Sequence, residues 1–486
     1  MSQPDDSQLS AGSPPPLRPE IQAALECLES PTPMVAVAPL EHSAAFLLFE
    51  LQERRHRRLH RLGELGHQDL LDAYLSQANL MHGLGSSFLL KGSDVRPNLA
   101  LLNDLTDQIR AVSGYADFLG PVTPDSLWAL GYHDPVVYLL AGPEMGYALV
   151  FQTSNPPRYG LIRLPQFTRQ AVFAHGLRCR FLYEREEDYE VTLQQLEIET
   201  SWCWKACMRD VCSAFQAGSR LTMIPLEYAT FLPLHLAWTQ DAGASTGRRY
   251  ALDHLVLSYA PSLRIAGHVR RLPVPRTASP LAAIAPSADG DLPYSGPEVR
   301  YAGSRYGRKP LVNEQATRDA FIAQIGRAAI LHFAGHARSS ISVPWASNLF
   351  LRDAPLTALE LARRNVDCET PLAILSACAS SLGSVAKPEQ ALSVANTMLV
   401  CGFRGVVASL WRVIDSAGAL LMCRFHETLD TSTHVPETLR AAQQWLRDAP
   451  PGALRAAAQS YGFTLDVEED ALREPFAWGA FIHTGL

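Results

Sequence analysis

Two short apolar runs in the second half of the chain stop abruptly at reactive side chains. Residues 328–334 lead to His336, and residues 371–375 lead to Cys378. Runs of this length, bounded by Pro, Ser or Gly, are typical of strands buried in a parallel sheet. The carboxyl ends of such strands share one edge of the sheet, where α/β proteins place their chemistry. The pattern therefore predicts that His336 and Cys378 lie side by side, if the strands are neighbours joined by a crossover over residues 354–367.

Elsewhere the pattern first favours helices and then alternates between strands and helices. Apolar residues at helical spacing predict helices over residues 43–60, 68–80 and 98–112. From about residue 125 the texture changes. The predicted strands are 135–141 and 147–151, which form a hairpin, then 161–165, 221–225, 255–263, 281–286, 406–410 and one near 478–483. The predicted helices are 166–217, 231–238, 390–400, 416–429, 437–447 and one that starts within 313–321.

These changes divide the chain into four segments. Residues 1–18 contain the Ser-Pro-Pro-Pro sequence and are expected to be a flexible tail. Residues 19–124 form a helical N-terminal region. Residues 125–270 and 271–486 are two α/β segments, and the proline-rich stretch 264–310 is expected to be the linker that crosses between them.

Composition narrows the class of protein. Of the 486 residues, 47% are hydrophobic and 19% are charged, as in a soluble globular protein of about three domains. The formal net charge of −7 gives no electrostatic footprint for nucleic acid, so that partner is not expected. The sequence has neither a signal peptide nor an apolar run long enough to span a bilayer. Its nine cysteines make no disulfide framework, which favours the reducing cytoplasm.

Three local patterns bear on ligands. The basic run 54–61 could hold RNA or a nucleotide, or it could be a solvated helix face, and both interpretations stay open. The spacing of Cys203, Cys207 and Cys212 lacks the paired elements of a zinc site. The Asp-Gly-Asp sequence at residues 289–291 is interpreted as a turn. No metal ion and no cofactor are therefore expected.

The pairing of a histidine with a cysteine points to nucleophilic chemistry. A free thiol is only about 3% thiolate near neutral pH, so a nucleophilic cysteine needs a base beside it. His336 could be that base for Cys378. The alternative is that Cys378 is a small buried hydrophobe and His336 a loop histidine, but finding both at equivalent strand ends favours the dyad.

Four segments of the sequence resemble the successive motifs of the CHAT family, which are caspase-like cysteine peptidases related to separase. They are Ile-Leu-His-Phe-Ala-Gly-His-Ala at 330–337, Leu-Ser-Ala-Cys at 375–378, Gly-Val-Val-Ala-Ser-Leu-Trp-Arg-Val-Ile-Asp at 405–415 and Pro-Phe-Ala-Trp-Gly-Ala-Phe-Ile-His-Thr-Gly at 475–485. Weaker matches extend upstream to about residue 125, so that the resemblance covers roughly three quarters of the chain.

The resemblance implies an α/β fold, a caspase-like parallel-sheet sandwich in two halves with an N-terminal helical region. The first half, 125–270, would be inactive, and the second half, 271–486, would carry the catalytic residues. Helical repeats often precede the peptidase in this family. Because no clean repeat of about 34 residues is found, a helical cap on the catalytic domain and a decayed solenoid that receives a partner both stay open.

The resemblance also assigns roles to residues. His336 and Cys378 would form the catalytic dyad, and the backbone N–H groups of Ala337 and Cys378 would bind the oxyanion. Asp415 could face a basic P1 side chain or could be a helix N-cap. Trp411 could line the substrate pocket or fill the core. The chain departs from the family at Ala337, where glycine is common.

A second departure follows the cysteine, where family members often have an acidic residue and this chain has Ala379. It bears on the nucleophile loop more than on the reaction class. At Ala337, a left-handed backbone would cost more than at glycine because alanine has a Cβ.

The expected function is a cytoplasmic cysteine endopeptidase that cleaves specific protein partners, regulated, in bacterial stress or defence signalling. An activating protein or ligand could bind through the N-terminal helices. One alternative is a catalytically silent CHAT scaffold that binds protein partners. Another is a different cysteine hydrolase, such as a glutamine amidotransferase, but that class usually places its histidine after the cysteine and flanks the nucleophile with glycines.

Overall fold

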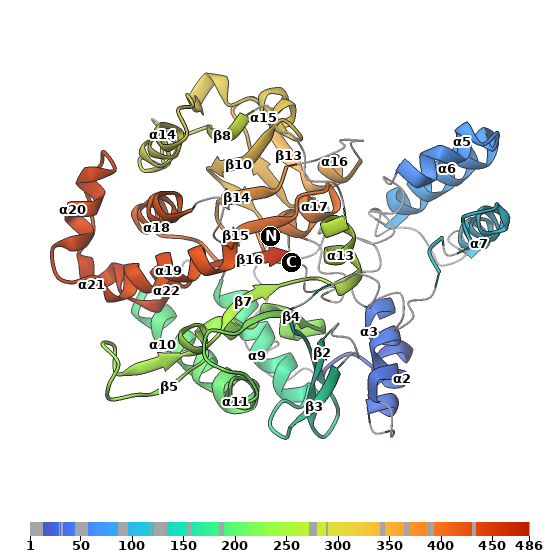
Figure 1. Ribbon diagram of the computed structural model, residues 1–486, viewed down its shortest axis with the longest axis horizontal. Helices are drawn as coiled ribbons and strands as arrows, with labels where there is room; N and C mark the ends of the chain where they lie inside the picture. Colours follow the sequence, from blue (N-terminus) through green and yellow to red (C-terminus); the bar gives the residue numbers. More distant parts are fainter. Residues whose placement is uncertain are drawn as a thin grey trace.

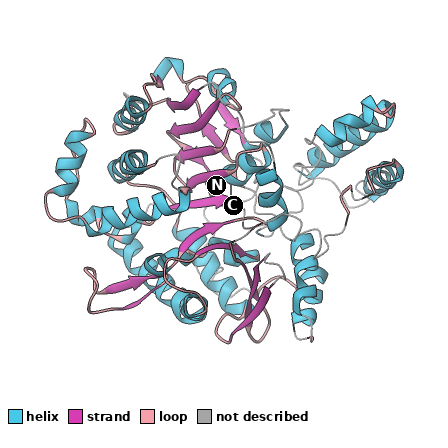
Figure 2. Ribbon diagram, in the orientation of Figure 1, coloured by secondary structure: helices cyan, strands magenta, loops and turns pink. Residues whose placement is uncertain are grey.

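An 11-stranded sheet forms the centre of the molecule (Figures 1 and 2). The computed structural model describes residues 13–28, 30, 33–43, 57–85, 96–116, 118–120, 132, 134–152, 158–183, 189–271, 279–287, 290–340, 346–363, 370–383, 385, 388, 393–429 and 434–485. In the order in which they lie side by side, the strands are β3 (Arg158–Leu164), β2 (Gly146–Gln152), β1 (Val136–Ala141), β4 (Arg220–Pro225), β7 (Val256–Tyr259), β16 (Phe481–Gly485), β15 (Gly405–Ser409), β14 (Leu372–Ser376), β10 (Ala328–Ala334), β8 (Ser279–Ala285) and β9 (Leu311–Val312).

The sheet is mixed and mostly parallel, which confirms the predicted α/β fold. Strands β8, β10, β14 and β15 are parallel to one another, and so are β1, β4 and β7. The antiparallel pairs are β1 with β2, β2 with β3, and β15 with β16. The predicted hairpin is therefore confirmed, and β10 and β14 are neighbours, as the two apolar runs indicated.

Both faces of the sheet are covered, which explains why its central strands are apolar throughout. Ile330 and Ala334 pack into one hydrophobic cluster, and Leu331 and Phe333 pack into another on the opposite face. Helices α14 (Ser295–Arg305), α18 (Asp415–Thr428) and α19 (Val435–Asp448) cover the first face, and α15 (Arg318–Gln324), α16 (Ala358–Arg363) and α17 (Val394–Val400) the second (Figure 1). The alternation follows from the two-residue period of a strand.

The N-terminal helices form two groups. Helix α2 (Pro19–Leu28), the 3₁₀ turn η1 (Pro33–Ala36) and α3 (Val37–Ser43) pack against β1 and β4. The buried carboxyl group of Glu41 accepts a hydrogen bond from the Tyr138 hydroxyl at 2.7 Å and from the Leu263 N–H at 2.8 Å. This group therefore caps the sheet at β1 and β4, which lie in residues 125–270 and not in the segment expected to be catalytic.

Helices α5 (Arg57–Glu64), α6 (Gln68–Gly85) and α7 (Arg96–Ala111) make a separate apolar cluster. The helices predicted over 68–80 and 98–112 are confirmed. Most of the helix predicted over 43–60, much of the basic run 54–61 and residues 1–12 of the tail lie outside the described residues.

The region between β3 and β4 is helical, as predicted, with α9 (Arg169–Leu182), α10 (Tyr189–Cys203), a π-helical turn η2 (Trp204–Met208) and α11 (Arg209–Ser213). The helix predicted over 231–238 is wrong. Two 3₁₀ turns, η3 (Glu227–Phe231) and η4 (Leu234–Leu236), stand there instead, followed by a small hairpin of β5 (Trp238–Gln240) and β6 (Arg248–Tyr250) and by α12 (Ala251–His254). Pro233 lies between the turns, where its ring prevents an α-helix from continuing.

The linker predicted over 264–310 is also largely wrong, because this stretch contains α13 (Leu263–Arg271), β8 and α14. Three of its described prolines lie where regular structure tolerates them: Pro280 at the start of β8, Pro286 just after it and Pro297 in the first turn of α14.

The β10–β14 connection is likewise more elaborate than the predicted crossover. It holds a small sheet of β11 (Ala337–Arg338), β12 (Asn348–Phe350) and β13 (Pro355–Thr357) before α16. The 3₁₀ turn η5 (Asn313–Gln315) precedes α15, and the last helices are α20 (Ala453–Ser460), α21 (Glu469–Leu472) and α22 (Pro475–Trp478). Within the described part of the chain, no helix has the length and apolarity that crossing a bilayer requires.

Candidate active site

His336 and Cys378 leave the same edge of the sheet. His336 stands two residues after β10 and Cys378 two residues after β14, and the register of these parallel strands pairs Ala334 with Ser376. The Gly335 N–H donates to the Ser376 carbonyl oxygen at 3.0 Å, which ties the two strand ends together just before the candidate dyad. The predicted placement of the two residues at adjacent strand ends is what the fold contains.

The loop that carries Cys378 is held from β15. The Ser409 hydroxyl donates to the Ala377 carbonyl oxygen at 2.6 Å, and the Ser409 N–H donates to the Ser380 hydroxyl oxygen at 3.1 Å. Ala379 has a φ of 52°, in the left-handed region, and its N–H donates to the Trp411 carbonyl oxygen at 3.1 Å. The backbone strain anticipated at Ala337 is thus absent, since Ala337 is extended in β11; it lies at Ala379 instead.

The Cys378 thiol is half-buried and is not in a disulfide. Burial raises its pKa, and the negative charge of Asp415 adds to the rise. The backbone N–H groups of Val413 and of Cys378 itself, and the charge of Arg412, act in the opposite direction. The net result is a sulfur that is held as the thiol at neutral pH.

The imidazole of His336 bonds to a carboxylate group rather than to the Cys378 thiol. Its Nε2 atom lies 2.9 Å from an Asp291 carboxylate oxygen, and its side chain is 38% exposed. Both His336 and Cys378 are described, and no hydrogen bond joins them in this structure. The two residues lie on the same edge of the sheet, here called the rim. The His336 imidazole, however, is hydrogen-bonded to Asp291 and not to the thiol.

Asp291 is the partner that sequence reasoning missed, because its Asp-Gly-Asp segment was interpreted only as a turn. It follows β8, the strand next to β10. Since the ends of neighbouring parallel strands meet at one edge, its place after a predicted apolar strand was the signal that could have found it.

Asp415 interacts electrostatically with both candidate catalytic residues, His336 and Cys378. Burial raises its pKa to about 6, Glu298 and Asp466 add to the rise, and His336 opposes it. Asp415 is the first residue of α18, whose N-cap is Ile414. One of its carboxylate oxygens accepts a hydrogen bond from the Tyr294 N–H at 3.0 Å, so it serves α14 rather than capping its own helix.

Trp411 is completely buried. Its indole N–H donates to the Phe476 carbonyl oxygen at 2.8 Å, and its ring stacks on the Phe476 ring with centroids 5.4 Å apart. Of the two predictions for Trp411, this position favours the core residue. It supports the Cys378 loop from below through its carbonyl group and offers no surface to a substrate.

The register of β11 against β12 shows which way the N–H group of Ala337, one of the two predicted oxyanion donors, is directed. The Phe350 N–H donates to the His336 carbonyl oxygen, and Ala337 lies opposite Leu349. In an antiparallel ladder this makes Ala337 and Leu349 a non-hydrogen-bonded pair, so the Ala337 N–H points away from β12. It therefore makes no ladder hydrogen bond to β12.

A family model described as CHAT domain matches residues 198–486, which is more than half of the chain. The chain belongs to the CHAT-domain family. The match begins within α10, whereas the resemblance noted in the sequence extends upstream to about residue 125. No curated protein matches the sequence.

Two solved structures of the Saccharomyces cerevisiae separase–securin complex are structurally similar. The first has 10% sequence identity and a TM-score of 0.47, over 85% of this chain and 35% of the matched chain. The second has 11% identity and a TM-score of 0.44, over 86% of this chain and 36% of the matched chain. The present chain therefore spans about a third of the length of the chains that it matches.

Beneath the rim of this CHAT domain lies a buried polar chain that the sequence did not suggest. His332, inside β10, has its Nε2 atom 2.8 Å from a Glu298 oxygen and its Nδ1 atom 2.8 Å from Nε2 of His426. The Ser376 hydroxyl donates to the other Glu298 oxygen at 3.2 Å. Burial raises the pKa of Glu298 to about 8 and lowers the pKa of His332 to about 3, so all these groups are neutral at pH 7.

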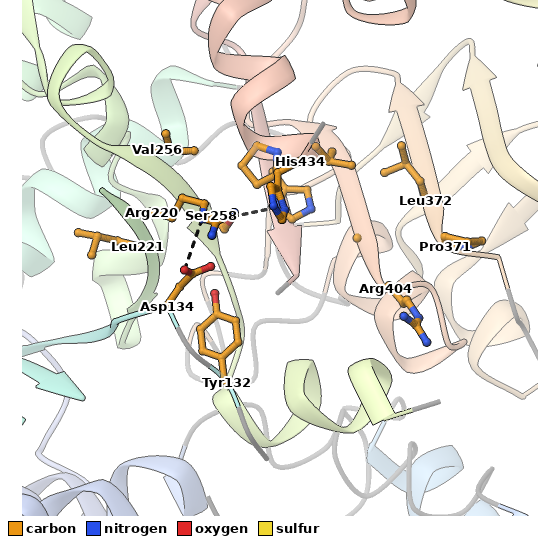
Figure 3. Close-up of a pocket in the computed structure, with 14 residues that line it drawn as sticks. Tyr132, Asp134, Arg220, Leu221, Val256, Ser258, Pro371, Leu372, Arg404 and His434 are labelled. Atoms are coloured by element: carbon orange, nitrogen blue, oxygen red, sulfur yellow. Dashed lines mark hydrogen bonds and ion pairs between the residues drawn. The ribbon is translucent and has the colours of Figure 1, made fainter. Parts of the chain in front are cut away.

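A cavity of about 250 Å³ lies at the other end of the CHAT-domain strands (Figure 3). Leu372 and Gly405, the first residues of β14 and β15, line it, whereas Cys378 follows the last residue of β14. Arg220 and Asp134, which both line the cavity, form an ion pair at 3.4 Å. Because neither His336 nor Cys378 is in its lining, this cavity is separate from the candidate active site.

No group of three metal-ligating side chains occurs among the described residues. Cys203, Cys207 and Cys212 are all buried in the helical core, and the Cys207 thiol donates to the Cys203 carbonyl oxygen at 3.2 Å. The three side chains are therefore part of the hydrophobic core on one face of the sheet.

Proposed function

We propose that this CHAT-domain protein is a cysteine endopeptidase in which His336 and Cys378 form the catalytic dyad. The observation that carries the proposal is their position at the carboxyl ends of adjacent parallel strands, β10 and β14, in a chain of this family. The proposed fold is a caspase-like sandwich in which 271–486 is the catalytic half and 125–270 an inactive half.

In the proposed mechanism His336 accepts the Cys378 proton, and the thiolate attacks the peptide carbonyl carbon. A C–S bond forms while the carbonyl π electrons move to oxygen, where the N–H groups of Ala337 and Cys378 stabilise the charge. The C–N bond then breaks, and His336 returns the proton to the departing amine. Water hydrolyses the thioester, with His336 again as the base, and restores the thiol.

Two features support the proposal that the enzyme is regulated. The His336 imidazole is paired with Asp291, and the pKa of the Cys378 thiol is raised. Activation would then require the imidazole to leave Asp291 and reach the sulfur. An activating protein or ligand bound through the N-terminal helices, and a role in bacterial stress or defence signalling, belong to the same proposal.

Substrate choice is proposed to depend on Asp415, which would attract a lysine or arginine side chain at P1. Its carboxyl group is half-buried on the rim that carries Cys378 and interacts with both Cys378 and His336. With a pKa of about 6, it is mostly ionised at pH 7 and could pair with a cation.

The second candidate function is a catalytically silent scaffold that binds protein partners. The observation in its favour is that His336 bonds to Asp291 rather than to Cys378. For such a scaffold, neither side chain of the dyad would matter to partner binding.

The test is cleavage of a peptide library that holds every residue at P1, under reducing conditions. The wild type should cleave after basic residues, and Cys378→Ala and His336→Ala should abolish cleavage. Cys27→Ala is the matched control, because Cys27 is likewise a half-buried free cysteine and lies far from the rim in α2. Cleavage that survives Cys378→Ala would overturn the peptidase, and no cleavage by any form, with or without candidate activators, would favour the scaffold.

A further inference from the structure

A buried arginine from a distant helix reaches both loops of the candidate dyad. Arg180 lies in the last turn of α9 and is 0% exposed. Its Nε atom donates to the Gly383 carbonyl oxygen at 3.1 Å, 203 residues away along the chain. Its Nη2 atom donates to the Ser339 hydroxyl oxygen at 3.2 Å. Gly383 belongs to the loop that follows Cys378, and Ser339 to the loop that follows His336.

The two loops are also bonded to each other at this point. The Ser339 hydroxyl, which accepts from Arg180, donates to the Leu382 carbonyl oxygen at 3.2 Å. Arg180, Ser339 and the 382–383 backbone thus form a closed set of hydrogen bonds. A planar guanidinium group with donors in a fixed fork suits this task, because it holds two acceptors at a defined angle.

The end of α9 also contacts the third segment of the rim. Tyr183, the C-cap of α9, packs on Trp411 with ring centroids 5.0 Å apart. Trp411 in turn accepts a hydrogen bond from the Ala379 N–H. One helix end therefore supports the segments after β10, β14 and β15.

The position of Arg180 rules out direct recognition of a substrate, since its side chain has no exposed surface. Burying a guanidinium group is costly unless its donors are bonded, and here two of its nitrogens, Nε and Nη2, donate to the two loops. A hydrophobic side chain of similar length could fill the same space without that cost. The arginine is explained by what it fixes rather than by packing.

We propose that Arg180 is a positioning residue that locks the His336 loop to the Cys378 loop. The catalytic part of this inference rests on the proposed peptidase function. The lock sets the distance between the Ala337 and Cys378 N–H groups, which must converge on one oxyanion. A displacement of about 1 Å in such a site costs about a hundredfold in rate.

The test compares Arg180→Met, which keeps the aliphatic stem and removes the donors, with Arg180→Lys and with Arg178→Met. Arg178 is the matched control, because it lies on the same helix and bonds to Glu199 rather than to either loop. Hydrogen exchange of residues 337–340 and 379–383 reports the lock without any substrate. Arg180→Met should speed exchange in both segments at least tenfold, whereas Arg178→Met should leave it unchanged.

Peptide cleavage supplies the second readout. Arg180→Met should lower kcat about a hundredfold with KM within about twofold, because the change disturbs the oxyanion site and not the substrate pocket. Arg180→Lys should recover part of kcat. A folded Arg180→Met variant with wild-type exchange in both segments would overturn the lock, and a change confined to KM would overturn its role in positioning.

The two proposals fail in different ways. If the wild type cleaves no peptide, with or without candidate activators, the peptidase proposal fails, and the exchange data alone decide whether Arg180 locks the loops. If Arg180→Met does not fold, Ser339→Ala replaces it, since that variant removes the shared hydroxyl and keeps the arginine. Faster exchange of residues 379–383 in Ser339→Ala would support the lock, and unchanged exchange would contradict it.

Discussion

Asp415 and Cys378 show at the scale of single residues how the rim sets reactivity. The carboxylate of Asp415 raises the pKa of the thiol, and Asp415 itself titrates at about 6. Asp415→Asn should therefore lower the thiol pKa and raise the rate of Cys378 alkylation by iodoacetamide at pH 7.5 roughly threefold, which corresponds to half a pKa unit. Near pH 5 the wild-type carboxyl group is mostly protonated, so the two rates should converge.

Mass spectrometry of the alkylated peptides measures this between pH 5 and 9. Cys27 in the same samples is the internal control and should react equally in both proteins. A slower reaction of Cys378 in Asp415→Asn at pH 7.5 would contradict the electrostatic role of Asp415. A faster thiol together with lost cleavage after basic residues would separate its effect on the nucleophile from its proposed effect on specificity.

The left-handed backbone at Ala379 gives a second prediction. An L-residue in this region costs about 1–2 kcal/mol, and glycine removes that cost while losing about 0.4–1 kcal/mol of unfolded-state advantage. Ala379→Gly should leave the free energy of unfolding unchanged or raise it by about 1 kcal/mol. Ala377→Gly, at a buried position outside the left-handed region, should lower it by about 1–2 kcal/mol. Urea unfolding of both variants decides the matter, and equal losses would refute the strain.

At the scale of elements, the buried Glu298 joins four of them. Its contacts connect α14 to β10 through His332 and to β14 through Ser376, and His426 adds α18. Because the folded pKa of about 8 exceeds the usual value near 4.5, the folded state keeps a proton that the unfolded state loses. The stabilisation is full below pH 4.5 and is lost as the pH rises through about 8.

Glu298→Gln should remove this dependence, since a glutamine reproduces the protonated carboxyl group. The free energy of unfolding of the wild type, relative to the variant, should fall between pH 5 and 8 by up to about 1.4 kcal/mol per pH unit. Because Glu298 adds to the rise in the Asp415 pKa, both proteins carry Asp415→Asn, so that Asp415 does not contribute to the difference. Denaturant unfolding at four pH values measures the difference, and a flat profile would mean that Glu298 is ionised in the folded protein.

Glu360→Gln is the control of opposite sign. Hydrogen bonds from Thr357 and the charge of Arg318 lower the pKa of Glu360. Its contribution is therefore present above the unfolded pKa near 4.5 and lost only as the pH falls below it. Between pH 5 and 8 the Glu360→Gln comparison should stay flat.

The same elements show what the sequence can and cannot foretell. Apolar runs bounded by small residues identified β10 and β14, and the rules of parallel sheets then placed His336 and Cys378 on one edge. The sequence did not indicate which distant side chains contact these strands and the loops that follow them. Asp291, Glu298 and Arg180 bond to residues that are 34 to 203 positions away along the chain. Local sequence patterns do not indicate contacts over such separations.

Errors in secondary structure had a different origin. Pro233 interrupts a stretch that looks helical by its apolar content, whereas Pro280, Pro286 and Pro297 lie at or next to the ends of elements in a stretch predicted to be a linker. In both cases the position of a proline within its element, rather than its presence, decides the outcome.

For the whole molecule, the last strand holds the sheet together. β16 lies between β7 and β15, with five residue pairs to β15 and the pair Thr484 and Tyr259 to β7. The Ser258 hydroxyl and the His483 ring lie 2.9 Å apart and form a further link between β7 and β16. Both residues line the cavity of Figure 3. Strand β16 therefore joins the group of strands that ends at β7 to the group that begins at β15.

Removing residues 480–486 should therefore lower and broaden the unfolding transition. The deletion would leave β7 and β15 as unpaired edges and uncover apolar surface in the middle of the sheet, and such edges associate with other chains. Urea unfolding followed by tryptophan fluorescence, with gel filtration of the folded sample, measures both effects: a loss of monomer and a lower, broader transition. A chain without residues 1–12, which the sequence predicts to be part of a flexible tail, should unfold as the full chain does. If the chain without β16 stayed monomeric and unfolded at the same urea concentration with the same slope, the two strand groups would have to be held together by helix packing alone.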